Sequence, residues 1–217
     1  MLNYKGLLQK GSDMTQRLLE YFSDYNVCYR CGARYPEPKV LNEDGGLPCA
    51  SGGCTKVVYM NAVTVPVVLQ PIYDDRELHR KVGLLIIRRG KQGDPGYLKW
   101  AYPGGFQGIE DWRVAATREE FEEVGIRHEQ ESIKDLGMMM TTPDGTKNLM
   151  FCMAPALSCA DAMKTFKAAA DDAANIEVAG ARVIYEMEEL AFPMHTQVCE
   201  RFFTEIAPKL RYEIFGL

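Results

Sequence analysis

Four glutamates stand within five residues of this chain, at Glu119, Glu120, Glu122 and Glu123. On a helix from Trp112 to Val124, the first, third and fourth of them occupy positions i, i+3 and i+4 and share one face. Like charges at that spacing destabilise a helix unless a cation lies between them. Mg²⁺ and Mn²⁺ are hard ions that prefer such oxygen ligands. The crowding therefore predicts a divalent metal site formed by Glu119, Glu122 and Glu123, with Glu120 pointing elsewhere.

The residues around the glutamates define where this helix starts and stops. A glycine-rich turn containing Gly104 and Gly105 precedes it, and we expect the helix to begin at about Asp111 or Trp112. Gly125 follows the last helical residue, where glycine commonly ends a helix. A solvated acidic face is the ordinary explanation for a run of glutamates, and the flanking pattern is what favours a metal site here.

Four cysteines form a second cluster, as the pairs Cys28/Cys31 and Cys49/Cys54. Two such pairs separated by a short loop can hold one zinc ion tetrahedrally through four thiolates. The second spacing is wider than that of most zinc knuckles, and two disulfides or a chance grouping are the alternatives. With all four positions filled by protein, the predicted Zn²⁺ site is structural. The other three cysteines are unclustered, and we expect them to be ordinary core residues.

Composition limits the kinds of partner. The net charge of −5 gives no support to a protein that coats nucleic acid, which needs clustered lysines and arginines. No apolar run approaches the length of a membrane span. The odd number of cysteines, seven, and the lack of a signal-peptide pattern favour a reducing, cytoplasmic location.

Strand-like and helix-like segments alternate along the chain, which predicts an α/β or mixed fold. The strand-like segments read AVTVPVVLQPIY, VGLLIIRR and IEVAGARVIY, together with DLGMMMTTPDGTKNLMFCMAPAL, which reads as two strands around a Pro-Asp-Gly turn. The helix-like segments lie at about 13–25, at 112–124, in CADAMKTFKAAADDAA and in the C-terminal stretch. The first of these helices has Leu18, Leu19 and Phe22 on one face, as expected for a packing helix.

The spacing Gly104, five residues, Glu110, seven residues, Arg118-Glu119, Glu122-Glu123, Gly125-Ile126 resembles the Nudix box, G-x5-E-x7-R-E-U-x-E-E-x-G-U with U apolar. Eight of nine specified positions match. The departure is Glu120, which stands where the family has an apolar residue. The resemblance implies a Nudix α/β/α sandwich with a mixed sheet.

A four-cysteine ribbon before such a domain is similar to the arrangement in the NADH pyrophosphatase branch and its smaller relatives. We therefore expect an N-terminal helical segment at 1–27, a zinc ribbon at 28–60 and a Nudix domain at 61–217. The branch carries an SQPWPFPxS-type segment after the box, whereas this chain has MMMTTPDGTKNLMF there. Specificity for NADH therefore does not carry over.

The resemblance implies Mg²⁺- or Mn²⁺-dependent hydrolysis of a nucleoside diphosphate linked to another group X. Candidate substrates are NAD(H), ADP-ribose, FAD, a diadenosine polyphosphate and an NAD-like RNA cap. By resemblance, Glu119, Glu122 and Glu123 bind metal and Arg118 orients them. Gly104 and Gly105 let the loop fold tightly, with Glu110 in support.

The general base is left open between Glu119 and a carboxylate outside the box. Glu177 lies where relatives with an E-[IV]-x-x-A-R segment place an additional metal-binding glutamate, and a surface residue is the alternative. Phe106 and Tyr102 flank the box and could stack on a base, whereas Trp100 and His195 suit core packing better.

Two functions compete. The first is the Nudix pyrophosphatase, acting on a nucleotide-containing small molecule, with nucleic acid as a partner only in the form of capped RNA. The second is a non-catalytic Nudix-fold ligand sensor or regulator whose zinc ribbon binds nucleic acid or a protein. The intact set of mutually repelling carboxylates favours the enzyme. By resemblance we also expect a homodimer.

Overall fold

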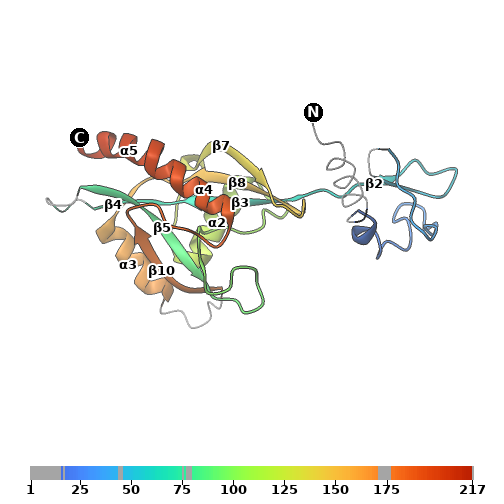
Figure 1. The fold of residues 1–217 in the computed structure, drawn as a ribbon, viewed down its shortest axis with the longest axis horizontal. Coiled ribbons are helices and arrows are strands. Elements are labelled where there is room, and N and C mark those ends of the chain that lie inside the picture. Colours follow the sequence, from blue (N-terminus) through green and yellow to red (C-terminus); the bar gives the residue numbers. More distant parts are fainter. Residues whose placement is uncertain are drawn as a thin grey trace, which may run out of the picture. The chain divides into compact units, whose positions relative to one another are not determined.

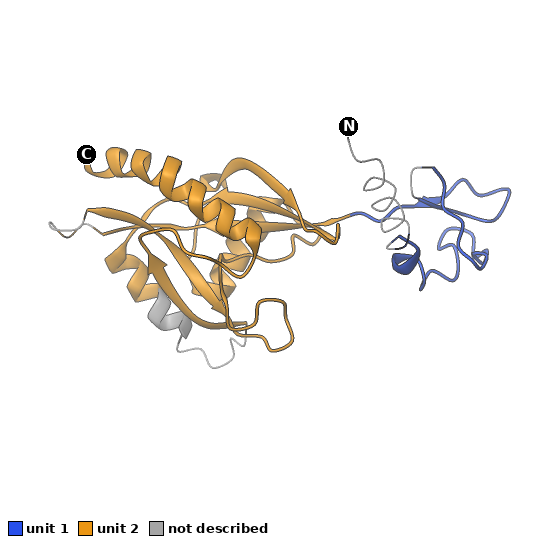
Figure 2. Cartoon of the chain, in the orientation of Figure 1, with its two compact units in different colours: residues 1–61 blue, residues 62–217 orange. Residues whose placement is uncertain are grey.

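The computed structural model describes residues 16, 18–43, 46–74, 76, 80–170 and 177–216, and for 166–170 the backbone alone. Residues 1–61 and 62–217 form two compact units (Figure 2). The predicted N-terminal helix lies partly outside the described residues, and 18–21 are helical. No helix in these ranges has the length and apolar composition needed to span a bilayer.

The first unit is built around a short hairpin and a small core. Strands β1 (Leu47–Pro48) and β2 (Val57–Val58) pair antiparallel. The buried hydrophobic residues of this core are Phe22, Cys28, Tyr35 and Leu47. So small an apolar cluster supplies little of the burial that holds a domain together, which is why such units commonly depend on a bound metal.

The second unit contains two sheets. The larger has the strand order β10-β5-β4-β9, with β6 also paired to β5. Its strands are β4 (Pro71–Asp74), β5 (Lys81–Arg89), β6 (Trp100–Ala101), β9 (Leu157–Ser158) and β10 (Val178–Ile184). The smaller has the order β3-β8-β7, with β3 (Val63–Leu69) parallel to β8 (Lys147–Met153) and β7 (Lys134–Thr141) antiparallel to β8.

Helices cover both faces of this framework (Figure 1). They are α2 (Trp112–Val124), α3 (Cys159–Ala170), α4 (Pro193–Arg201) and α5 (Ala207–Phe215), with a π-helical segment, η2, at Phe202–Ile206 and a short 3₁₀ turn, η1, at Gln130–Ser132. The predicted α3 segment continues into 171–174, outside the described residues.

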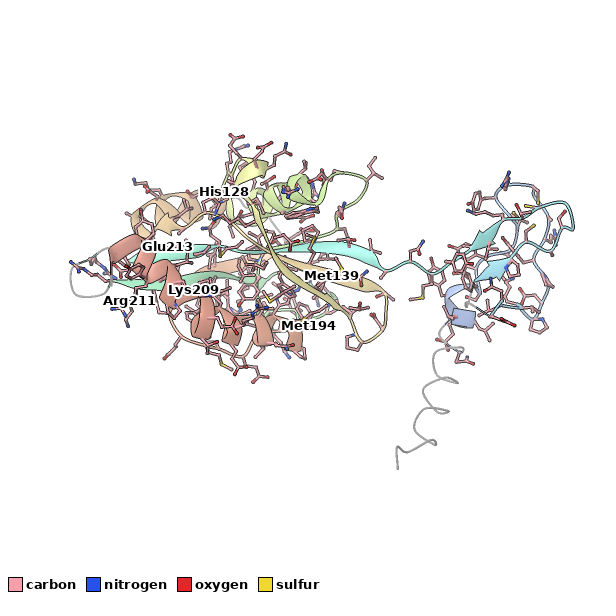
Figure 3. All side chains as sticks on the ribbon, turned by 90° about the horizontal axis from the view of Figure 1, so that it is seen from above. His128, Met139, Met194, Lys209, Arg211 and Glu213 are labelled. Atoms are coloured by element: carbon pink, nitrogen blue, oxygen red, sulfur yellow. The ribbon has the colours of Figure 1, made fainter. Side chains whose placement is uncertain are left out.

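Strand β5 shows how one strand serves two cores. Leu85 and Ile87 pack with Val124 and Ile126 at the end of α2. Leu84 and Ile86 point to the opposite face, toward the C-terminal helices, because successive strand side chains alternate. Helix α5 carries the exposed charged residues Lys209, Arg211 and Glu213, which Figure 3 labels. The predicted α/β/α arrangement with mixed sheets is confirmed.

Candidate functional site

The glutamate-rich helix has the predicted ends. Asp111 is its N-cap, with its side chain accepting a 2.9 Å hydrogen bond from the backbone N–H of Arg113. Gly125 closes it in the left-handed conformation at φ 73°, and its N–H donates to the Phe121 carbonyl. Within this helix Glu119 and Glu123 are buried, whereas Glu122 is exposed.

Arg118 is the centre of the carboxylate cluster. Its Nη1 donates to Glu119 at 2.7 Å and to Glu122 at 3.0 Å. Its Nε and Nη2 both donate to Oε1 of Glu110, at 2.9 and 2.7 Å. Nη2 also reaches the carbonyl of Phe106 at 3.0 Å. One planar guanidinium thus fixes three carboxylates and the preceding loop, as its rigid set of donors allows.

The loop before α2 approaches the carboxylates so closely that only glycine fits. A Cβ atom on Gly105 would lie 2.3 Å from the carboxylate of Glu119. Gly104 has φ 151°, and a Cβ there would lie 2.3 Å from the carbonyl oxygen of Pro66 in β3. The backbone N–H of Gly104 donates a 2.8 Å hydrogen bond to Glu123. The two glycines therefore allow the loop to contact both β3 and α2 closely.

Burial and mutual repulsion make these carboxylates hard to ionise without a cation. Burial raises the pKa of Glu119, an effect that Arg118 opposes and that the charges of Glu122 and Glu177 reinforce. Burial also raises the pKa of Glu123 to about 8, against the hydrogen bond from Gly104. A bound cation would stabilise the ionised forms, which is the electrostatic signature expected of a metal site.

The residues present fit a hard divalent cation. The site offers several carboxylate oxygens next to a tight loop. Carboxylate oxygens are ligands that Mg²⁺ and Mn²⁺ prefer. In the described residues, the carboxylates of the box do not gather as tightly as the four cysteines do, whose ligand atoms all lie within 4.8 Å of one another.

Glu177 lies close to the same cluster. It is exposed and directly precedes β10, and its carbonyl accepts a 2.7 Å hydrogen bond from the N–H of Gly90, next after β5. Its charge contributes to raising the pKa of both Glu119 and Glu123 after the larger effect of burial. The antiparallel pairing of β10 with β5 therefore brings Glu177 within electrostatic range of the helix.

The two aromatic candidates lie in different environments. Phe106 is 53% exposed. Tyr102 is 2% exposed and its ring stacks on His195, with centroids 5.3 Å apart. The expected stacking of Tyr102 on a base therefore does not fit its buried position. His195 has the core role expected of it: burial lowers its pKa to about 3, with Arg89 adding to the effect.

Glu120 is the residue that sequence reasoning left without a role. Its side chain is completely buried, and neither of its oxygens has a hydrogen-bond partner among the described residues. Nε2 of His128 lies 3.7 Å away and hydrogen-bonds the Oε1 of Gln70 at 2.7 Å. Burial, and then the charge of Glu123, raise the pKa of Glu120 to about 8. The departure from the box is thus accommodated as a neutral, buried acid at neutral pH.

His128 and Gln70 were also missed. The Nε2 of Gln70 donates to the carbonyls of Pro71 and Pro155, at 2.9 and 2.8 Å, so its Oε1 must face His128 as an acceptor. Figure 3 labels His128. No local sequence pattern connects Gln70 with His128, since 58 residues separate them in the chain.

The four cysteines converge as predicted. Their sulfur atoms lie within 4.8 Å of one another, with 3.9 Å between Cys28 and Cys54 and 3.5 Å between Cys31 and Cys49. A tetrahedral zinc with Zn–S bonds of about 2.3 Å places its sulfurs about 3.8 Å apart. Gly32, at φ 73°, allows the first turn, in which its N–H donates to the Cys28 carbonyl. The cluster could therefore hold one zinc ion.

Solved structures resemble this chain, although no family model and no curated protein match it. A Nudix hydrolase from Nitrosomonas europaea is 22% identical, with 83% of this chain and 92% of that chain covered and a TM-score of 0.55. A mutT/nudix family protein from Listeria innocua is 21% identical, with 70% and 98% covered and a TM-score of 0.53.

A third structure, a MutT/nudix family protein from Enterococcus faecalis, is 20% identical with a TM-score of 0.46. That match covers 60% of this chain but 46% of the other, so this chain spans less than half of that protein's length. The two structures with TM-scores above 0.5 show, at identities of 22% and 21%, a shared fold. The implied Nudix fold is therefore confirmed, and the branch with NADH pyrophosphatases stays a prediction.

Proposed function

We propose that this protein is a Mg²⁺- or Mn²⁺-dependent pyrophosphatase that hydrolyses a nucleoside diphosphate linked to a group X. The observation that carries the proposal is the set of carboxylates fixed by Arg118 beneath the loop at Gly104 and Gly105. It occupies the Nudix-box positions in a chain with a Nudix fold. A protein without a cation-dependent role would gain stability by losing these mutually repelling, buried charges.

Glu119, Glu122 and Glu123 are the metal-binding residues in this proposal. When bound, the metal ions neutralise charge on the diphosphate oxygens and activate a water molecule. Arg118 holds Glu119 and Glu122 in orientation through Nη1, and the N–H of Gly104 holds Glu123. Glu110 supports the cluster by fixing the other side of the Arg118 guanidinium.

The proton from the attacking water goes to a carboxylate near the metal site. Glu119 is one candidate, since it belongs to the carboxylate cluster and Arg118 holds its orientation. Glu177 is the other, since its charge acts on both buried glutamates. Phe106, half exposed beside the cluster, is the proposed stacking surface for a base.

The decisive experiment is a hydrolysis panel with Mg²⁺ and Mn²⁺. The substrates are NADH, NAD, ADP-ribose, FAD, a diadenosine polyphosphate, nucleoside triphosphates and NAD-capped RNA, with products identified by mass. Cleavage within a diphosphate that requires the divalent ion supports the proposal. Ligand binding without any turnover would instead support the non-catalytic sensor. Sedimentation at micromolar concentration tests the predicted homodimer in the same preparation.

A further inference from the structure

Tyr35 carries a buried hydroxyl group in the core of the first unit. The residue is 6% exposed, and its hydroxyl oxygen is fully enclosed. Among the described residues, that oxygen has no hydrogen-bond partner. An enclosed hydroxyl without a partner costs free energy, because it has given up its hydrogen bonds to water. In a native protein such a group normally has an acceptor, so the acceptor for Tyr35 has to be identified.

The path of the chain places Tyr35 beside Cys28. Val27 and Arg34 face each other across an antiparallel bridge, and both are exposed. Cys28 and Tyr35 are the next residues of the two segments, and they are only 1% and 6% exposed. Since successive side chains alternate between the two faces, Cys28 and Tyr35 share the inner face. Diagonal neighbours on one face of an antiparallel pair lie within reach of an aromatic side chain.

The core around Tyr35 contains few side-chain acceptors. The hydrophobic side chains that pack there with it belong to Leu18, Phe22, Tyr25, Cys28, Leu41, Leu47, Cys49, Cys54 and Val58. The hydroxyl of Tyr25 lies 3.4 Å from that of Tyr21, in an exposed pair. Lys39 has its Nζ 6.0 Å from the centre of the Tyr35 ring, but an ammonium group cannot accept a hydrogen bond. The cysteine sulfurs are therefore the side-chain acceptors that remain among these residues.

A bound metal ion turns these sulfurs into better acceptors. The sulfur of a thiol is a weak acceptor, whereas a hydrogen bond to an ionised group is stronger. Zinc binding requires deprotonated cysteines, and four thiolates around one Zn²⁺ leave excess negative charge on the sulfurs. Of the four cysteines, Cys28 is the buried one, so solvent is poorly placed to donate to its sulfur. The hydroxyl of Tyr35 is a donor on the same inner face.

We propose that the Tyr35 hydroxyl donates a hydrogen bond to the Cys28 thiolate when the four-cysteine site holds zinc. The hydrogen bond satisfies the buried hydroxyl and stabilises the negative charge on the most enclosed of the four ligands. Tyr35 thereby raises the affinity of the site for the metal. This inference rests on the predicted zinc site and is independent of the proposed hydrolysis.

Two tyrosines of the first unit allow a matched comparison. Tyr35→Phe removes the hydroxyl and keeps the ring, so the packing of the core is retained. Tyr29→Phe makes the same chemical change between Cys28 and Cys31, where the tyrosine is 71% exposed. The control is therefore adjacent to a metal ligand in the chain but has a hydroxyl that water can solvate.

The test uses the full chain and two metal ions. Competition with a chelating indicator should show that Tyr35→Phe binds Zn²⁺ roughly tenfold to a hundredfold more weakly, the range for losing a hydrogen bond to a metal ligand. Co²⁺ held by thiolates has a sulfur-to-cobalt charge-transfer band, whose energy falls when a hydrogen bond to sulfur is lost. We expect this band at longer wavelength in Tyr35→Phe. Tyr29→Phe should match the wild type in both measurements.

A role in packing alone would give a different result. The zinc affinity of Tyr35→Phe would then fall while its Co²⁺ band stayed in place, and that result would overturn the assignment. Unchanged zinc affinity, or equal effects of the two substitutions, would overturn it as well. Should Tyr35→Phe not fold, 3-fluorotyrosine at position 35 keeps the ring and provides a stronger donor. The band should then move to shorter wavelength, and an unmoved band would refute the hydrogen bond.

The outcomes also separate this inference from the other assignments. Wild-type protein that binds neither Zn²⁺ nor Co²⁺ would defeat the zinc site and this inference together. Wild-type protein that binds both ions, with a Tyr35→Phe variant indistinguishable from it, would defeat this inference alone. Neither result depends on the carboxylates of α2, whose function the hydrolysis panel tests.

Discussion

The backbone N–H of Gly104 donates a 2.8 Å hydrogen bond to Oε2 of Glu123, a residue in the last turn of α2. The next residue, Gly105, lies so close to Glu119 that a Cβ would reach its carboxylate at 2.3 Å. The positions of two proposed metal ligands thus depend on the path of a loop that contacts them through its backbone.

Replacing Gly105 by alanine should displace the Glu119 carboxylate, since the added carbon occupies its place. We expect turnover to fall on the order of a hundredfold, as misplacement of a catalytic group by about 1 Å can cause. The control is Gly180→Ala in β10, where a Cβ meets nothing within 4 Å. Assays at saturating Mg²⁺ measure the effect, and equal activity of the two variants would contradict the close approach.

Glu123→Gln should abolish turnover, because it removes a metal-binding charge while keeping the acceptor for the Gly104 N–H. Without divalent ion the variant should be as stable as the wild type or more stable at pH 8, since burial disfavours the charge of Glu123. Glu122→Gln should likewise abolish turnover. Kinetics and urea unfolding check both properties, with the exposed Glu129→Gln as control. Near-normal rates in Glu123→Gln would show that α2 does not form the metal site.

Glu177→Gln and Glu119→Gln, measured on one substrate, decide which carboxylate is the base. Loss of the general base should lower the rate by roughly a hundredfold to ten-thousandfold. Substrate binding measured in Ca²⁺ should change far less. A Glu177→Gln enzyme with full activity would show that Glu177 has no catalytic role and would leave Glu119 as the candidate base.

Glu120 should make the protein less stable as the pH rises. Its folded-state pKa is raised to about 8, so the folded protein keeps a proton that the unfolded chain releases near its ordinary value of 4.5. The free energy of unfolding is therefore expected to fall between about pH 5 and pH 8 and to level off above that.

Glu120→Gln removes the titrating carboxyl group. Its free energy of unfolding should therefore decline less over the same pH interval. The difference from the wild type should grow with pH to the order of a few kcal/mol. Urea unfolding at several pH values, without added divalent ion, measures this difference. Subtracting the two profiles removes the contribution that Glu123 makes in both proteins. Parallel pH profiles would show that Glu120 is not buried in solution as it is here.

The four-cysteine cluster should hold about one zinc ion per chain, and Cys31→Ser should lose it and reduce solubility. The reason is that the first unit has too small an apolar core to fold without metal. Elemental analysis of protein purified without chelator measures the content. Cys159→Ser, outside the cluster, should keep its zinc. Zinc-free wild-type protein that is folded would refute the assignment.

Local features of the protein could be predicted from the order of its residues. The ends of α2 follow from Asp111 and Gly125, whose side-chain cap and left-handed backbone act within a few residues. The shared face of Glu119, Glu122 and Glu123 follows from helical periodicity, and the approach of the two cysteines within each pair follows from a short turn.

Tertiary structure decided what depends on residues distant in the sequence. Glu120 and Glu122 are the same residue type two positions apart. Glu120 is fully buried beside His128, whereas Glu122 is exposed. Tyr102 is a core residue because His195 of α4 stacks on it. Glu177 lies beside the end of β5 because β10 pairs with β5. Strand pairing and burial are set by the packing of the whole unit, and no local period of two or 3.6 residues encodes them.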